Sequence, residues 1–296
     1  MPKRTSIFRR RSVKPSLFRA SCAGVLTMLS GSAMPAPAPA QAPAFIASNI
    51  GWQLLGGKYG GKDFQPPPQG SPGAAGPVGA HPDHPHICNM CGGTPNLRIG
   101  NDRSPLLTQW AADEMKKTNQ AILAGGVPFD PAARCWPAGV PAVVTFAIEP
   151  LYFAQAKGDV VMLYQRGQVA RHVYMDRPHS ARVKPSWYGE SVGHYEGDTF
   201  VVDTIGLSDK SFVDVFNTPH TNALHVVERY KTIENGNLLQ VVITVDDPGA
   251  FTKPWSAMKI HGQVSKPLEE SICAENNGDL LNQGVRPLPV AERPDF

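Results

Sequence analysis

From residue 141 onward the sequence is a succession of short apolar runs separated by turn residues, and this pattern constrains the fold more than any other feature. Runs such as "DVVMLYQ", "TFVVDTIG" and "LLQVVITVD" have the length and the β-branched content of strands. The connections "KGD", "EGDT" and "ENGN" are typical of hairpins, because Gly and Asn accept the positive φ that tight turns need. The short intervals leave no room for crossover helices, so we expect the sheet to be antiparallel.

About eight to ten consecutive strands of this kind predict a closed or nearly closed meander barrel of lipocalin-like architecture, with a sandwich as the alternative. The runs extend from "AVVTFAI" (142–148) to "EESICAE" (269–275). Before them, "SPLLTQWAADEMKKTNQAIL" predicts one helix, with Ser104 as N-cap and Pro105 at the first helical position. Residues 206–223 form a long connection between two strands, and long ordered loops frequently carry function.

The first 42 residues differ from the rest of the chain. They contain seven basic residues and no acidic ones, and they end in the apolar run "ASCAGVLTML" and the small-residue run "SAMPAPAPAQA". This order is typical of an export signal, with cleavage near Ala40 or Ala42, and the run "RRRSVK" also fits a twin-arginine signal. We therefore expect a periplasmic or secreted protein. Residues 43–103 form a Gly/Pro-rich irregular segment and residues 104–296 the helix and the barrel domain.

The charge balance of the mature chain excludes one class of partner. Without the signal segment, 21 Lys and Arg residues face 25 Asp and Glu residues. A mildly acidic protein lacks the electrostatic footprint of a nucleic-acid-binding protein, so we exclude DNA and RNA as partners. No other apolar run approaches the roughly 18 residues of a membrane-spanning helix, so we expect no membrane span. A small-molecule ligand or substrate is the expected partner.

Several blocks of the sequence resemble a recurring pattern in an uncharacterised family of exported bacterial β-rich proteins. The blocks are, in order, "CWPAGVP", "SVGHYEGDTFVVDTIG", "PHTNALHVVERY", "DPGAFTKPW" and "CAENN". The resemblance covers roughly residues 104–277 and implies a single fold and export, but no particular reaction. This chain has Ala142 where the family usually has Arg, and Glu190 where it often has His, so a role that needs either group is not carried over.

The stretch "HPDHPHICNMCGG" (81–93) is rich in metal-ligand side chains. Imidazole and thiolate bind zinc and copper, so His84, His86, Cys88 and Cys91 could supply four ligands from one loop. No cofactor is certain from this pattern. The alternative interpretation is a disulfide at the two cysteines, either local or to other cysteines, with exposed histidines.

Four cysteines remain after the signal segment: Cys88, Cys91, Cys135 and Cys273. An even number in an oxidising compartment favours disulfides, and four cysteines allow three pairings, among which the sequence does not choose. Two interpretations of Cys135 and Cys273 are open. They form either a nucleophilic or redox pair, or a disulfide that joins the segment before the first strand to the last strand. Of these two interpretations, we favour the disulfide.

Strand alternation predicts where the carboxylates lie. In "LHVVERY", Glu228 shares a face with Leu224 and Val226, so it is expected to be buried and to need a partner, such as an arginine, or a raised pKa. In "FVVDTI", Asp203 shares a face with Val201 and Ile205. Carboxylates that point into a barrel beside imidazoles suit general acid–base catalysis.

This reasoning gives one set of candidate catalytic residues: His179, Asp203, His220, His225 and Glu228. The histidines would move protons and the carboxylates would orient or activate them, in a hydrolysis, elimination or isomerisation that needs no cofactor. The alternatives are structural roles for all five, a metal site at His220 and His225 with a carboxylate, and a carrier without turnover. The sequence alone does not decide whether the chain is an enzyme. It has no G-x-S-x-G elbow, phosphate loop or dinucleotide fingerprint, which argues against the common serine hydrolases and nucleotide enzymes.

Overall fold

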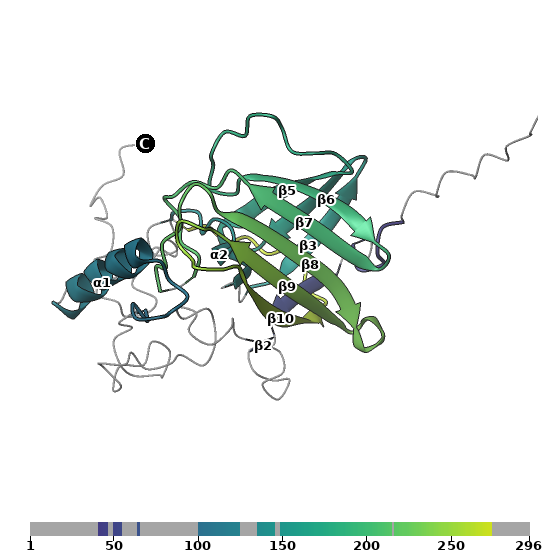
Figure 1. The fold of residues 1–296 in the computed structure, drawn as a ribbon. Helices are drawn as coiled ribbons and strands as arrows, with labels where there is room; N and C mark the ends of the chain where they lie inside the picture. Colours follow the sequence, from purple (N-terminus) through teal and green to yellow (C-terminus); the bar gives the residue numbers. More distant parts are fainter. Residues whose placement is uncertain are drawn as a thin grey trace, which may run out of the picture. The chain divides into compact units, whose positions relative to one another are not determined.

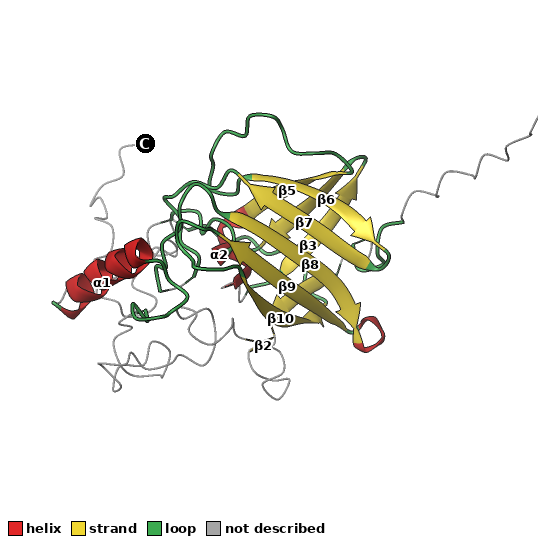
Figure 2. Cartoon of the chain, in the orientation of Figure 1, coloured by secondary structure: helices red, strands yellow, loops and turns green. Residues whose placement is uncertain are grey.

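The computed structural model describes residues 41–46, 50–54, 64–65, 100–124, 135–145, 149–214 and 216–273. Within these ranges the protein is mainly β, as the sequence predicts (Figures 1 and 2). The strands are β1 (Gly51–Leu54), β2 (Phe64–Gln65), β3 (Leu151–Ala156), β4 (Asp159–Tyr164), β5 (Val169–Met175), β6 (Glu190–Glu196), β7 (Thr199–Ile205), β8 (His225–Ile233), β9 (Leu238–Asp246) and β10 (Trp255–Val264). The helices are α1 (Gln109–Leu123), α2 (Ala142–Thr145) and the single turns η2 (Arg166–Gln168) and η3 (Glu234–Gly236).

Nine of the strands form a closed barrel, which confirms the predicted architecture. Strands β3 to β10 hydrogen-bond in chain order, and β1 closes the sheet by pairing with β10 on one side and β3 on the other. Trp52 of β1 lies opposite Leu151 of β3 and Gln263 of β10. The short strand β2 pairs with β10 beyond β1. The particular likeness to lipocalins stays a prediction.

One strand pair departs from the antiparallel arrangement that the sequence predicts. β5 and β6 are parallel, with Val173 opposite Ser191 and Met175 opposite Gly193. Residues 176–189 carry the chain back along the barrel without a helix. An extended segment of this length can cover a seven-residue strand, roughly 23 Å, so the absence of crossover helices did not require every pair to be antiparallel.

The helix α1 begins later than the sequence predicts. Its N-cap is Thr108, whose side chain accepts a hydrogen bond from the Ala111 backbone N–H at 3.3 Å. Ser104 instead accepts from the Leu106 backbone N–H in a turn, and Leu107 bridges to Phe251 in the segment before β10. The turn at Pro105 and Leu106 and the contact with that segment therefore keep the first residues of the expected helix out of α1.

At the two ends of the strand region, the described residues of two predicted strands have another structure. Residues 142–145 form the short helix α2, because Val143 and Val144 are buried there and the Thr145 hydroxyl donates to the Val213 carbonyl. Tertiary contacts thus override the β propensity of the valines. Residues 269–273 form no strand, since β9 and β1 already occupy both edges of β10 and a closed barrel has no free edge.

The Gly/Pro-rich segment contributes to the core, although its composition suggests little to build one from. Phe45, Ile46 and Trp52 are buried, and the ring centroids of Phe45 and Phe153 are 5.4 Å apart. Burial of each large side chain contributes about 1.5–3 kcal/mol. The β1 segment therefore closes the barrel with side chains as well as with backbone hydrogen bonds.

Cys135 and Cys273 form a disulfide, with their Cα atoms 5.6 Å apart. It joins the segment before α2 to the segment after β10, which confirms the structural interpretation of these two cysteines. Because the bond closes a loop of 138 residues, it is expected to stabilise the fold by about 4–5 kcal/mol in the chain-entropy model. In the described ranges no helix has the length and apolarity to cross a bilayer.

Candidate acid–base site

Three of the predicted residues meet on the outer face of the barrel. Asp203 of β7 accepts hydrogen bonds at the same carboxylate oxygen, Oδ1, from two imidazoles: Nε2 of His179 at 2.8 Å and Nε2 of His225 at 3.0 Å. His179 lies in the connection after β5, and His225 begins β8. Three of the residues that were selected from the sequence therefore lie in one hydrogen-bonded cluster.

The expectation that Asp203 points into the barrel is wrong. Asp203 shares its face with Val201 and Ile205, as predicted, but that face is the outer one. The inner face of β7 consists of the buried residues Phe200, Val202 and Thr204. Alternation gives the two sets of residues, but both sets on this strand contain apolar side chains, so the pattern does not show which set faces inward.

Glu190 of β6 extends the outer cluster, and sequence reasoning missed it. Its Oε1 lies 3.2 Å from His179 Nδ1 and accepts from the Ser180 backbone N–H at 2.7 Å, while its Oε2 accepts from the Ser180 hydroxyl at 2.6 Å. The Ser180 hydrogen bonds lower the pKa of Glu190. The cluster is a half-exposed ion network with every member engaged.

Glu228 lies inside the barrel, fully buried, as the sequence predicts. Its two carboxylate oxygens accept from the guanidinium of Arg171 at 3.1 and 2.5 Å, and the Tyr230 hydroxyl donates to Oε1 at 2.8 Å. The remaining donors of Arg171 reach the hydroxyls of Ser191 and Thr204. The predicted arginine partner is thus present. The network saturates the carboxylate, which points to a structural role.

His220, in the long connection before β8, has a different environment. Its Nδ1 donates to the Thr221 backbone carbonyl at 2.9 Å, so Nε2 is the unprotonated nitrogen and accepts from the Ser211 hydroxyl, also at 2.9 Å. Burial lowers the pKa of His220, against smaller raising effects of the Thr221 hydrogen bond and of the Asp247 and Asp209 charges. The imidazole is therefore held neutral, in one tautomer, against a hydroxyl.

The surrounding loops fix this pair. Asp247, which is fully buried after β9, accepts from the backbone N–H of Thr221 at 2.6 Å and from its hydroxyl at 2.8 Å. On the other side, Gly139 has a φ of +75° and approaches Ser211 so closely that a Cβ at this position would lie 2.6 Å from the Ser211 Cβ. Both partners of the hydrogen bond are thus positioned by segments distant in the sequence.

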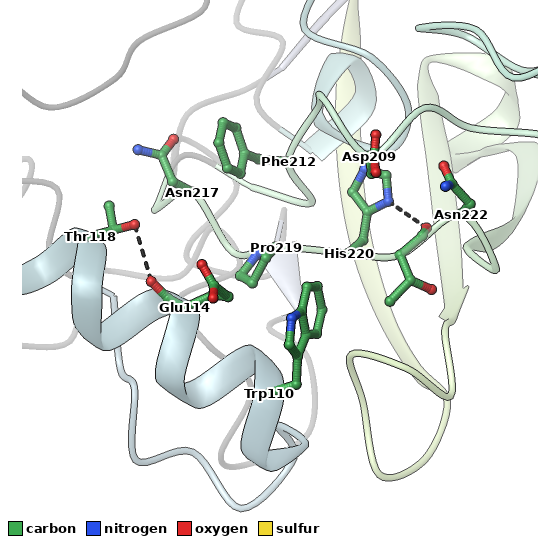
Figure 3. A pocket seen from close by; sticks show the side chains of 10 residues that line it. Trp110, Glu114, Thr118, Asp209, Phe212, Asn217, Pro219, His220 and Asn222 are labelled. Carbon is green, nitrogen blue, oxygen red and sulfur yellow. Dashed lines mark hydrogen bonds between the residues drawn. The ribbon is translucent and has the colours of Figure 1, made fainter.

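A pocket of about 410 Å³ lies beside His220. Figure 3 shows Trp110 and Glu114 of α1 on one side and His220, Asp209 and Asn222 of the long connection on the other. The other lining residues are Thr118, Phe212, Asn217, Pro219 and Thr221. Of the five predicted catalytic residues, His220 is the one that lines this pocket. Sequence reasoning missed Ser211, since a serine nine residues before a histidine matches no catalytic motif.

The structure does not support a metal site among the described residues, where no group of three or more His, Cys, Asp or Glu side chains is arranged to hold an ion. His220 uses both ring nitrogens in hydrogen bonds, and His225 binds Asp203. The four predicted ligands His84, His86, Cys88 and Cys91 lie outside the described residues. Zinc or copper binding there stays a prediction.

Comparisons with known proteins give no further guide to the site: no protein-family model, curated protein or solved structure matches the chain.

Proposed function

We propose that the protein is an exported enzyme that hydrolyses small, partly apolar esters at the pocket beside α1, without a cofactor. The observation that carries this proposal is the Ser211–His220 pair, in which a hydroxyl faces a neutral imidazole nitrogen at 2.9 Å. The pocket that His220 lines has a volume of about 410 Å³, which suits a small molecule. The basic, apolar and small-residue runs of the first 42 residues support export.

The pair supplies the proton transfers of an acyl-transfer reaction. The Ser211 oxygen attacks the acyl carbon while its proton moves to His220 Nε2, and the imidazolium then gives this proton to the departing alkoxide. A water molecule then attacks the acyl-enzyme and gives a proton to His220 Nε2, and this proton returns to the Ser211 oxygen as the acid is released. The Thr221 carbonyl holds the Nδ1–H throughout. Ser211 is buried in the free protein, so the mechanism requires the 206–223 connection to admit the acyl group to the hydroxyl.

Kinetics with p-nitrophenyl acetate and p-nitrophenyl butanoate test this proposal. We expect the full chain to hydrolyse at least one of them, and we expect Ser211→Ala and His220→Asn each to lower kcat/KM at least about a hundredfold. Matched controls are Ser256→Ala on β10 and His194→Asn on β6, both exposed and distant in sequence from the pocket loops. These variants should retain wild-type kcat/KM. A fluorophosphonate should label Ser211, as located by peptide mass.

Three outcomes would overturn the proposal: no turnover of either ester, unchanged turnover in both Ser211→Ala and His220→Asn, or labelling at another residue. Circular dichroism of each variant separates loss of chemistry from loss of fold. If a variant retains the wild-type spectrum and melting temperature but has a lower kcat/KM, the missing side-chain group is the cause of the loss.

The pH profile of kcat/KM gives an independent test. Because burial lowers the pKa of His220 below its ordinary 6.5, the base stays neutral to a lower pH than a free histidine. Activity should therefore fall on acidification, with its midpoint below pH 6.5. A midpoint above 6.5, or a profile that is flat down to pH 4, would contradict the role of His220 as base.

A further inference from the structure

The inner face of β10 presents two basic side chains, Lys259 and His261, to the barrel interior. Lys259 lies opposite Val241 of β9, and His261 lies opposite Leu239. Side chains directly opposite one another share a face of the sheet, and both partners on β9 belong to the buried core. Lys259 and His261 are accordingly only 2 and 3% exposed.

Lys259 is a cation in excess of the interior's carboxylates. On the described strands, the carboxylate that is buried within the barrel is Glu228, and Arg171 and Tyr230 already saturate it. Within the described part of the chain no acidic side chain forms an ion pair with Lys259. An unpaired ammonium in such an environment destabilises the fold, because burial removes its hydration without providing a counter-charge. An anion beside it would offset that cost.

The protonation of the two groups keeps Lys259 able to accept an anion. Burial lowers the pKa of Lys259 to about 7, so the amine is partly protonated at neutral pH and takes up its proton fully when an anion arrives. Burial and the Lys259 charge lower the pKa of His261 to about 3, so this imidazole stays neutral and does not compete for the anion.

The wall beside Lys259 on β9 and β10 is apolar. Ile243 and Ala257 lie opposite one another next to the Val241–Lys259 pair, and all three apolar side chains belong to the core. On β1, Trp52 lies opposite Gln263, four residues beyond Lys259 along β10, and its buried indole N–H has no hydrogen-bond partner in the part of the chain that the structure describes. Buried polar groups are nearly always satisfied, so the unpaired Lys259 cation indicates a ligand that brings acceptor oxygens.

We propose that the barrel interior binds a small carboxylate with an apolar body, and that Lys259 forms the ion pair with its carboxylate group. The apolar body lies against the Val241, Ile243 and Ala257 wall. This site is separate from the pocket beside α1, and it does not rest on the hydrolase proposal. It gives the barrel a binding capacity that requires no turnover.

Calorimetric titration of the full chain with octanoate and with octan-1-ol tests the proposal, because the two probes share an apolar body and differ in the charged group. We expect the wild-type protein to bind octanoate at least about tenfold more tightly than octan-1-ol, in line with a hydrogen-bonded charge pair. Lys259→Met should abolish this preference while retaining binding of the alcohol. Lys231→Met, on the exposed face of β8, should leave the preference unchanged.

Each contrary result overturns the proposal. If the wild-type protein binds the acid and the alcohol equally, no cation contributes to binding. If it binds neither, the proposed site does not exist. A preference that persists in Lys259→Met, or that disappears in Lys231→Met, assigns carboxylate binding to the surface. Lys259→Met removes an unpaired buried amine, so it should fold and melt no lower than the wild-type protein at pH 7. None of these measurements depends on hydrolysis.

Discussion

Asp203 and Glu228 lie on adjacent strands, one residue apart in register, yet they have opposite environments. Val202 lies opposite Glu228 and Asp203 lies opposite Val227, so the pleat directs one carboxylate outward and the other inward. The Asp203 side chain is 36% exposed and binds two histidines. The Glu228 side chain is 0% exposed and binds one guanidinium and one phenol.

The difference shows that burial, rather than the types of partner, decides what a carboxylate contributes. Inside the barrel a charge must be fully partnered, because removal of one partner leaves the other without compensation. On the outer face, water solvates whatever the neighbours leave free, and the net contribution of the ion network is small. Neither carboxylate borders the pocket of about 410 Å³. His220 is buried and does line this pocket.

The largest expected effect comes from breaking the interior pair. Arg171→Met should lower the free energy of unfolding by about 3–5 kcal/mol, because it leaves the Glu228 carboxylate buried without a cation. Urea unfolding monitored by tryptophan fluorescence measures this change. In the double variant Arg171→Met, Glu228→Met both charges are absent, so most of the loss should be recovered. A double variant as unstable as the single one would contradict the explanation by an unpaired charge.

An intermediate effect is expected at Asp214, a buried carboxylate with no cationic partner among the residues that bind it. It accepts from the Phe216 N–H and the Thr218 hydroxyl, yet burial raises its pKa from 3.8 to about 6. A raised pKa means that the protonated form stabilises the fold below pH 3.8 and that this stability is lost as pH rises through 6. The shift corresponds to about 3 kcal/mol.

Asp214→Asn should therefore be more stable than the wild-type protein at pH 7, by up to about 3 kcal/mol, and similar to it at pH 4. The amide retains an acceptor for the Phe216 N–H and donates to the Thr218 hydroxyl, so the turn is preserved. Urea unfolding at the two pH values measures the difference. A stability difference that does not change with pH would show that the ionisation of Asp214 is not its cause.

The smallest effect is expected on the outer face. Asp203→Asn should change the free energy of unfolding by at most about 1 kcal/mol, and the change should shrink in 1 M NaCl, because exposed ion pairs are screened. Glu196→Gln, which breaks another exposed pair, with Arg229, is the matched control and should behave alike. A loss comparable to that of Arg171→Met would mean that exposure does not distinguish the two carboxylates.

The sequence predicted part of this arrangement. The alternation in "LHVVERY" correctly indicated a buried Glu228 that needs a partner, and the residues that proved to share the outer cluster, His179, Asp203 and His225, were all selected by type. The face of Asp203 was not predicted, because Val201 and Val202 are both apolar and both are buried. The pairing of Ser211 with His220 was not predicted either, since segments distant in the sequence fix it.

The sequence by itself determined the strands, their turns and hence a mainly β barrel, because hydrophobic alternation and turn chemistry act over a few neighbouring residues. Only the tertiary structure decided how the barrel closes, through a β1 strand whose Gly/Pro-rich surroundings did not predict it, and which strand pair is parallel. It also decided which charges are buried together and which histidine borders a pocket. These features depend on contacts between residues far apart in the chain, whose free energy is set by packing and desolvation rather than by local preference.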